Sequence, residues 1–298
     1  MPGLFAQPAS GAPATPDGAD KDWLSMKHPT QVSLGTTKVL PPPPQTLVGQ
    51  DDTPPDTWLH VHIQPQPDDV TCGPTCLHAV YRYYGDNLPL ATITEEISQL
   101  RDGGTLAPLL ACHALRRGYK ARLFTFDLKT FDPTWLLGDP ARIPDKLRAQ
   151  MLVKADPKLH TVSQAYLDFL GLGGVLRFED LTRALIRRIL NRRTPILVGL
   201  SSTYLYREAR EVPATNEDND IAGLPAGHFV VLHGYDQTSR EVSVADPYAD
   251  NPLAEGHGYT VPIDRVICSI LLGIVTYDAN LLVIEPRTDA KSSHKGTL

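Results

Sequence analysis

Cysteine is scarce in this sequence, which has four in 298 residues. A secreted scaffold held by disulfides carries a much higher density, so these thiols are expected to be free groups, metal ligands or a nucleophile. Long apolar runs are also lacking, because the strongest run near the C-terminus, ICSILLGIV, is too short to cross a bilayer. The first residues, MPGLFAQPAS, contain neither the charged nor the apolar segment of a secretory signal. We therefore expect a soluble, cytoplasmic protein without a membrane partner.

Positive charge is in deficit, with a formal net charge of −6 and a pI of about 5.9. Proteins that bind nucleic acid usually present a basic face, so no nucleic-acid partner is expected. The one basic cluster, from Arg183 to Arg193, falls in an amphipathic helical pattern. It is interpreted as a solvated helix face.

Hydrophobic periodicity is absent from residues 1–57, which hold eleven of the 27 prolines, including the run from Pro41 to Pro44. This composition predicts a disordered N-terminal arm. We expect one folded domain over residues 58–286 and a flexible C-terminal tail over 287–298. Within the domain, residues 127–177 mix Pro and Gly with helical fragments and are interpreted as a helical insertion.

Helices are predicted mainly in the first half of the domain. After Cys72 the apolar residues recur at helical spacing up to Gly85, Thr92 and Glu95 form a capping-box pattern, and a third helix is expected over 105–117. Strands are predicted mainly in the second half; over the whole domain they are 58–63, 120–126, 195–200, 228–234, 241–246, 259–262, 273–277 and 281–284. The predicted fold class is α+β, with a helical lobe packed against an antiparallel sheet or half-barrel.

Cys72 stands at the junction between a turn-rich loop and a predicted helix. The N–H groups and the positive end of the dipole at a helix N-terminus stabilise a thiolate, which is the reactive form of cysteine. Pro74 fits the first turn because no backbone donor is needed there. Cys76, one turn later, is expected to be buried against the rest of the fold. Cys72 is therefore the candidate nucleophile.

A nucleophilic cysteine needs a base, and the base needs an orienting partner. His228 leads an apolar strand, and Asp246 closes the next strand, where Pro247 stops the pairing. In an antiparallel hairpin the first residue of one strand lies near the last residue of the next. His228 and Asp246 are thus predicted to be neighbours, as an oriented base requires.

Three segments, QPDDVTCGPTCLHAVYRYYG, GHFVVLHGYD and VADPY, resemble motifs of the papain-like cysteine peptidases. The resemblance is closest to the bacteriocin-processing (double-glycine leader) peptidases and their stand-alone relatives, and it extends over residues 58–284 apart from the predicted insertion. It implies a papain-like fold with Cys72 as nucleophile, His228 as general base and acid, and Asp246 as the residue that orients His228. It also implies that Gln66 donates to an oxyanion hole beside the backbone N–H of Cys72. Gln64 would face the same side of an extended loop, but the six-residue spacing to the cysteine favours Gln66.

A metal site is an alternative, because Cys72 and Cys76 lie four residues apart and several histidines are near in sequence. The further ligands would be His60, His62 or His78. Zinc sites normally show a second pair of spaced ligands, whereas Cys112 and His113 are adjacent. The run Cys-Gly-Pro-Thr-Cys has one residue more than a thioredoxin-like motif. We expect neither a metal ion nor another cofactor.

The function expected from these residues is hydrolysis of an amide bond in a peptide or isopeptide, with a peptide or protein as substrate partner. Two alternatives remain open. One keeps the chemistry and passes the acyl group to an amine, as an acyltransferase or amidase on a small peptide does. The other is a catalytically silent papain-like module that binds peptides and needs no thiol at position 72.

Overall fold

The computed structural model describes residues 57–100, 103–215 and 217–287. The predicted arm over 1–57 lies outside the described residues except for Thr57, and the predicted tail over 287–298 lies outside them except for Arg287. Within the described ranges, every helix is too short or too polar to cross a bilayer.

One mixed sheet forms the centre of the domain, with strand order β3-β2-β10-β4-β7-β8-β9 and β1 added against β7. All of its pairings are antiparallel except that between β2 and β3. The strands are β1 (Thr57–Trp58), β2 (Lys120–Thr125), β3 (Val175–Arg177), β4 (Ile196–Ser201), β7 (Gly227–Asp236), β8 (Glu241–Ala245), β9 (Gly258–Pro262) and β10 (Asn280–Glu285). A separate two-stranded ribbon is formed by β5 (Glu211–Val212) and β6 (Glu217–Asp218).

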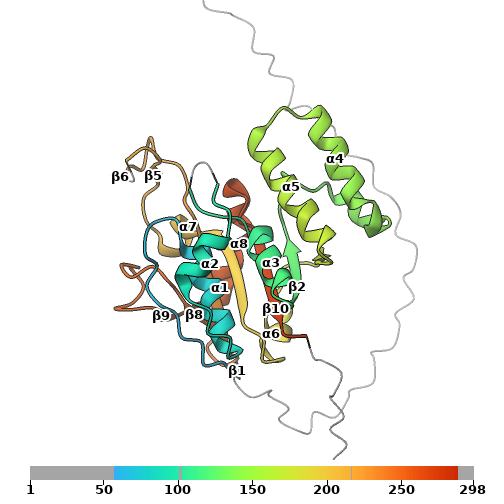
Figure 1. Cartoon of the computed structure of the whole chain (residues 1–298). Coiled ribbons are helices and arrows are strands. Elements are labelled where there is room, and N and C mark those ends of the chain that lie inside the picture. Colours follow the sequence, from blue (N-terminus) through green and yellow to red (C-terminus); the bar gives the residue numbers. More distant parts are fainter. Residues whose placement is uncertain (1–56, 101–102, 216, 288–298) are drawn as a thin grey trace, which may run out of the picture. The chain divides into compact units, whose positions relative to one another are not determined.

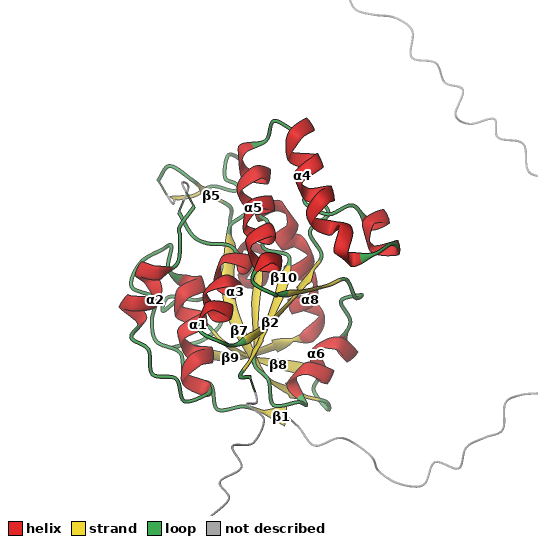
Figure 2. Cartoon of the chain, turned by 45° about the vertical axis from the view of Figure 1, so that its right-hand side comes forward, coloured by secondary structure: helices red, strands yellow, loops and turns green. Residues whose placement is uncertain are grey.

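Helices cover both faces of the sheet (Figures 1 and 2). The helices are α1 (Cys72–Tyr83), α2 (Leu90–Glu96), α3 (Ala107–Arg116), α4 (Ile143–Val153), α5 (Pro157–Gly171), α6 (Arg183–Leu190), α7 (Ser202–Tyr206) and α8 (Ile263–Leu272). The first five share one hydrophobic cluster, to which β7 contributes Phe229 and Val231. The last three share a second cluster, to which β7 contributes Val230 and Leu232. Successive side chains of a strand point to opposite faces, so a strand between two helical layers is apolar throughout.

The α+β class predicted from the sequence is confirmed, and the second helical layer is an addition to it. The predicted picture placed helices on one side as a lobe. The two layers explain why β7 is buried from His228 to Tyr235 and why its residues from Phe229 to Leu232 are all apolar.

Two of the predicted strands are wrong. Over 58–63 only Trp58 lies in a strand, because the residues after it have no partner in the sheet. The predicted alternation is nevertheless present, since Leu59 is buried while His60 and His62 are exposed. Over 273–277 the chain forms a 3-10 helix, η4 (Gly273–Thr276), which continues directly from α8 and ends at Tyr277 with a φ of 69°.

The predicted capping box is also wrong. The helix α2 begins at Leu90, two residues before Thr92, with Pro89 at the N-cap. Thr92 therefore lies inside the first turn rather than at its start.

The segment 127–177 contains α4, α5, β3 and two 3-10 helices, η2 (Pro133–Leu137) and η3 (Pro140–Arg142). Asp-Pro pairs start three of its four helices, η2, η3 and α5. Asp132, Asp139 and Asp156 each occupy an N-cap and accept hydrogen bonds from backbone N–H groups of the first turn. This use of aspartate at the N-cap and proline at the first helical position is favourable at a helix start. That the segment is an insertion stays a prediction.

Candidate active site

Cys72 is the first residue of α1 and follows Thr71 at the N-cap. Its side chain is 8% exposed. The start of the helix packs closely, because a Cβ atom on the next residue, Gly73, would lie 2.5 Å from Thr105 Cγ2. Glycine therefore lets the N-terminus of α1 approach the loop before α3.

His228 is the second residue of β7, and it contacts both of its predicted partners. Its Nε2 lies 2.8 Å from Oδ1 of Asp246. A carboxylate only accepts hydrogen bonds, so Nε2 carries the proton and Nδ1 is left for the other contact. The side chain of Cys72 is the other partner, and it interacts with the imidazole closely enough to contribute to the His228 pKa.

The charge state of His228 follows from these contacts. Burial alone would lower its pKa, but the negative charge of Asp246, the hydrogen bond to that carboxylate and the interaction with Cys72 outweigh burial and raise the pKa to about 10. The arrangement thus favours the charged imidazolium form of His228.

Asp246 follows the last residue of β8 and is completely buried. Besides His228, its Oδ1 accepts a bond from the backbone N–H of Tyr248 at 3.0 Å. Its Oδ2 accepts bonds from the hydroxyls of Tyr206 and Tyr259, both at 2.7 Å. Burial would raise the pKa of Asp246, but the charge of His228 and the hydrogen bonds from His228 and the two tyrosines lower it overall.

Tyr206 and Tyr259 were not found from the sequence. Tyr206 ends α7, and Tyr259 lies in β9, opposite Val244 of β8. No motif in the chain marks either residue, and only the position of Tyr259 in a strand beside β8 offers a signal.

The site lies at the edge of the sheet where β7 begins. His228 alternates with Phe229, so it faces the same side as Val230 and the second hydrophobic cluster, whereas α1 packs against the first. Cys72 and His228 therefore approach each other from opposite faces, past the end of the strand.

Gln66 lies in the loop before α1, and its backbone N–H donates to the carbonyl oxygen of Pro247 at 2.9 Å. The loop is thus fixed to the residue that follows Asp246. The side-chain Nε2 of Gln66 donates to the carbonyl oxygen of Asp68 at 2.9 Å, and Oε1 accepts no bond from the described residues. Gln64 is exposed, whereas Gln66 is half-buried.

A second buried carboxyl, Asp278, lies beside the start of β7. Gly227 precedes His228, and a Cβ atom added to it would lie 2.0 Å from Oδ2 of Asp278. The carboxyl of Asp278 therefore occupies the space that a side chain at position 227 would need. Burial raises the pKa of Asp278 to about 7, and the hydrogen bond with Thr276 and the positive charge of Lys158 offset this only in part.

Cys76 and two further histidines near the site have contacts of their own. Cys76 is fully buried, and His233 bonds the carbonyl oxygen of Leu59 through Nδ1 at 2.9 Å. His257 bonds the carbonyl oxygen of Asp246 in the same way at 2.8 Å. In the part of the chain that the structure describes, His, Cys, Asp and Glu residues form no group of three or more that could hold a metal ion.

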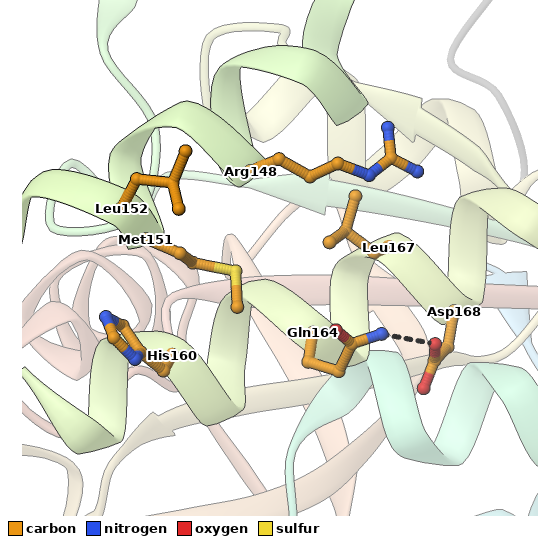
Figure 3. A pocket seen from close by; sticks show the side chains of 7 residues that line it. All are labelled: Arg148, Met151, Leu152, His160, Gln164, Leu167 and Asp168. Carbon is orange, nitrogen blue, oxygen red and sulfur yellow. Dashed lines mark hydrogen bonds between the residues drawn. The ribbon is translucent and has the colours of Figure 1, made fainter.

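A cavity of about 650 Å³ lies between α4 and α5 (Figure 3). Met151, Leu152 and Leu167 supply its apolar wall, and Arg148 and Asp168 lie at its charged rim. None of the four candidate residues lines it, so it is separate from the site at the sheet edge.

The family model described as the Peptidase C39 like family matches residues 58–260. No match was found among the curated proteins. A solved C39-like peptidase from Bacillus anthracis is similar at 16% identity, covering 79% of this chain and 100% of that one with a TM-score of 0.40.

Two further structures are similar at 15% identity and a TM-score of 0.38. One is a double glycine motif protease from an AMS/PCAT transporter in complex with the leader peptide, covering 77% of this chain and 94% of that one. The other is the peptidase domain of Streptococcus ComA, covering 76% and 100%. Because the family model matches more than half of the 298 residues, the chain belongs to the Peptidase C39 like family and is a cysteine peptidase-like hydrolase with an α+β fold.

Proposed function

We propose that the chain hydrolyses an amide bond in a peptide or isopeptide, with Cys72 as nucleophile, His228 as proton carrier and Asp246 as the residue that orients His228. The observation that carries the proposal is the chain of contacts from the Cys72 thiol through the imidazole to the buried carboxylate, with 2.8 Å between Nε2 and Oδ1. A thiol at a helix start next to an imidazole whose pKa is raised is an activated nucleophile.

The reaction begins when the thiolate of Cys72 attacks the amide carbonyl and forms a C–S bond. The negative charge passes to the carbonyl oxygen, where the backbone N–H of Cys72 and the Nε2 group of Gln66 are proposed to stabilise it. His228 then gives its proton to the leaving nitrogen, and the C–N bond breaks.

The second half of the reaction releases the acyl group. His228, now neutral, takes a proton from water while the water oxygen attacks the thioester. The C–S bond breaks, and the thiolate and the imidazolium are restored. Throughout, Asp246 holds the Nε2–H of the imidazole, so that Nδ1 faces the reacting atoms.

The experiment is incubation of the full chain with a mixture of blocked peptides, followed by mass spectrometry of the products. We expect new carboxyl termini with the wild type and none with Cys72→Ala. The exposed cysteine in α8, changed as Cys268→Ala, is the matched control and leaves the products unchanged. Cleavage by Cys72→Ala at the wild-type rate contradicts the proposal.

A parallel incubation with an added primary amine distinguishes hydrolysis from acyl transfer. Hydrolysis predicts free carboxyl products at every amine concentration. Amide products that increase with the amine would instead assign the chain as an acyltransferase with the same nucleophile. Peptide binding that is equal in the wild type and Cys72→Ala, without any product, would assign it as a binding module.

A further inference from the structure

We propose that Tyr206 and Tyr259 are positioning residues of this site, which keep Asp246 charged and hold the plane of its carboxylate so that one oxygen faces His228. The inference rests on the proposed function, because it assigns a role within the same site. Neither tyrosine is proposed to contact the substrate.

The two hydroxyls converge on one atom. Tyr206 comes from the end of α7 and Tyr259 from β9, and each donates to Oδ2 of Asp246 at 2.7 Å. Both side chains are buried, at 7% and 8% exposed. Burial, with the charge of Asp246 adding to it, raises the pKa of both phenols, so both remain protonated donors over the whole working range of pH.

The two hydroxyls supply hydrogen bonds to a carboxylate that has no access to water. Asp246 is 0% exposed, and an unpaired buried carboxylate would take up a proton rather than stay charged. Two donors reach Oδ2 from the tyrosines, and two reach Oδ1 from Nε2 of His228 and the backbone N–H of Tyr248. All the acceptor positions of the carboxylate are therefore used.

The two oxygens differ in what their partners can do. The imidazole Nε2–H and the backbone N–H of Tyr248 can only donate in this arrangement, whereas a hydroxyl can also accept. An amide at position 246 would therefore turn its oxygen to His228 and its NH2 group to Tyr206 and Tyr259, which would accept from it. The phenols thus complete the hydrogen bonding at position 246 in the same orientation, whether the residue there is a carboxylate or an amide.

The test uses the rate of iodoacetamide alkylation at Cys72, followed by mass spectrometry across the acid range of pH. The rate falls at acid pH, in the part of the profile called the acid limb, as the reacting thiolate takes up a proton. Protonation of Asp246 removes the charge that stabilises the imidazolium beside that thiolate, so the position of the acid limb depends on the carboxylate. We expect Tyr206→Phe and Tyr259→Phe each to move the acid limb upward by about half a pH unit or more, because each removes one hydrogen bond to the charged form. The double variant is expected to move it further.

Tyr166→Phe is the matched control. Tyr166 is as deeply buried, and its hydroxyl donates to Oδ1 of Asn280 at 2.8 Å, away from the candidate residues. This variant is expected to lower the unfolding midpoint without moving the acid limb. Unfolding curves for every variant give its folded fraction, and each alkylation rate is expressed per folded molecule. If the double variant does not fold, the acid limbs of the two single variants test the inference.

A second arm tests orientation. Asp246→Asn is expected to keep part of the low-pH reactivity of Cys72, and adding Tyr206→Phe and Tyr259→Phe to it is expected to abolish that part, since the NH2 group then has no acceptor. Acid limbs that coincide for the wild type and the tyrosine variants would overturn the inference and leave the proposed function standing. Absence of low-pH reactivity at Cys72 in the wild type would overturn both.

Discussion

The thiol of Cys76 donates a 3.1 Å hydrogen bond to the backbone oxygen of Phe229. Cys76 lies one turn after Cys72 in α1, and Phe229 directly follows His228 in β7. The bond therefore joins α1 to β7 directly beside Cys72 and His228, the two residues that are proposed to react. Burial raises the pKa of the Cys76 thiol well above its usual value, so it stays a protonated donor.

Removing this bond is expected to loosen the pairing of Cys72 with His228. Cys76→Ala should lower the free energy of unfolding by about 1–3 kcal/mol, from the lost bond and the small cavity. It should also slow alkylation of Cys72 per folded molecule. The control is Cys112→Ala, a buried thiol on α3 in the same hydrophobic cluster, which should cost similar stability without slowing Cys72. Equal effects of the two variants on Cys72 would show that the bond has no special role.

Gln66 is expected to act on turnover rather than on the nucleophile. Its backbone is fixed to Pro247, and the loss of one oxyanion donor typically lowers kcat by about 100- to 1,000-fold. Gln66→Ala should therefore lower kcat by that order while the alkylation rate of Cys72 stays the same. The exposed Gln64, changed in the same way, serves as the control and should leave kcat near that of the wild type. A larger loss from Gln64→Ala would assign the donor to position 64.

Asp278 should make the stability of the fold depend on pH. Burial raises its pKa from the ordinary 3.8 to about 7. Below about pH 4 the carboxyl is protonated in the folded and the unfolded chain, whereas between about pH 4 and 7 the unfolded chain ionises first. The free energy of unfolding therefore falls as the pH rises through this range, by at most about 4 kcal/mol, and is level above it.

Asp278→Asn is neutral at every pH and should remove this fall, so the variant gains stability relative to the wild type as the pH rises from about 4 to about 7. Urea denaturation at a series of pH values measures the difference. For Asp236→Asn the stability relative to the wild type is expected to fall, rather than rise, as the pH increases. The reason is that the backbone N–H groups of Ser239 and Thr238 lower the pKa of Asp236 in the folded chain. Parallel curves for Asp278→Asn and the wild type would contradict the account.

The contact between His228 and Asp246 could be predicted because it depends on local geometry. The two residues are joined through one hairpin, so the direction of the strands and the turn place them side by side. The position of Cys72 at the start of α1 followed from the same kind of local signal, namely the change from a turn-rich loop to helical spacing.

Tyr206 and Tyr259 could not be predicted, because the contact is made between elements whose relative position depends on how α7 and β9 pack. The strand expected over 58–63 shows a related limit. Its alternation correctly indicates that Leu59 is buried and His60 exposed, but alternation does not supply a pairing partner. The side-chain pattern thus predicts which residues face the core more reliably than it predicts whether a segment pairs with a neighbouring strand.

The measurement that tests the central claim most directly is the rate of iodoacetamide alkylation at Cys72 from about pH 4 to about pH 9, in the wild type and in His228→Ala. The exposed thiol of Cys268 is read in the same spectra as an internal comparison. The account predicts that Cys72 reacts faster than Cys268 below neutral pH and that His228→Ala abolishes this difference. A Cys72 that titrates as an ordinary thiol near about pH 8.5, or that reacts equally fast without His228, would contradict it.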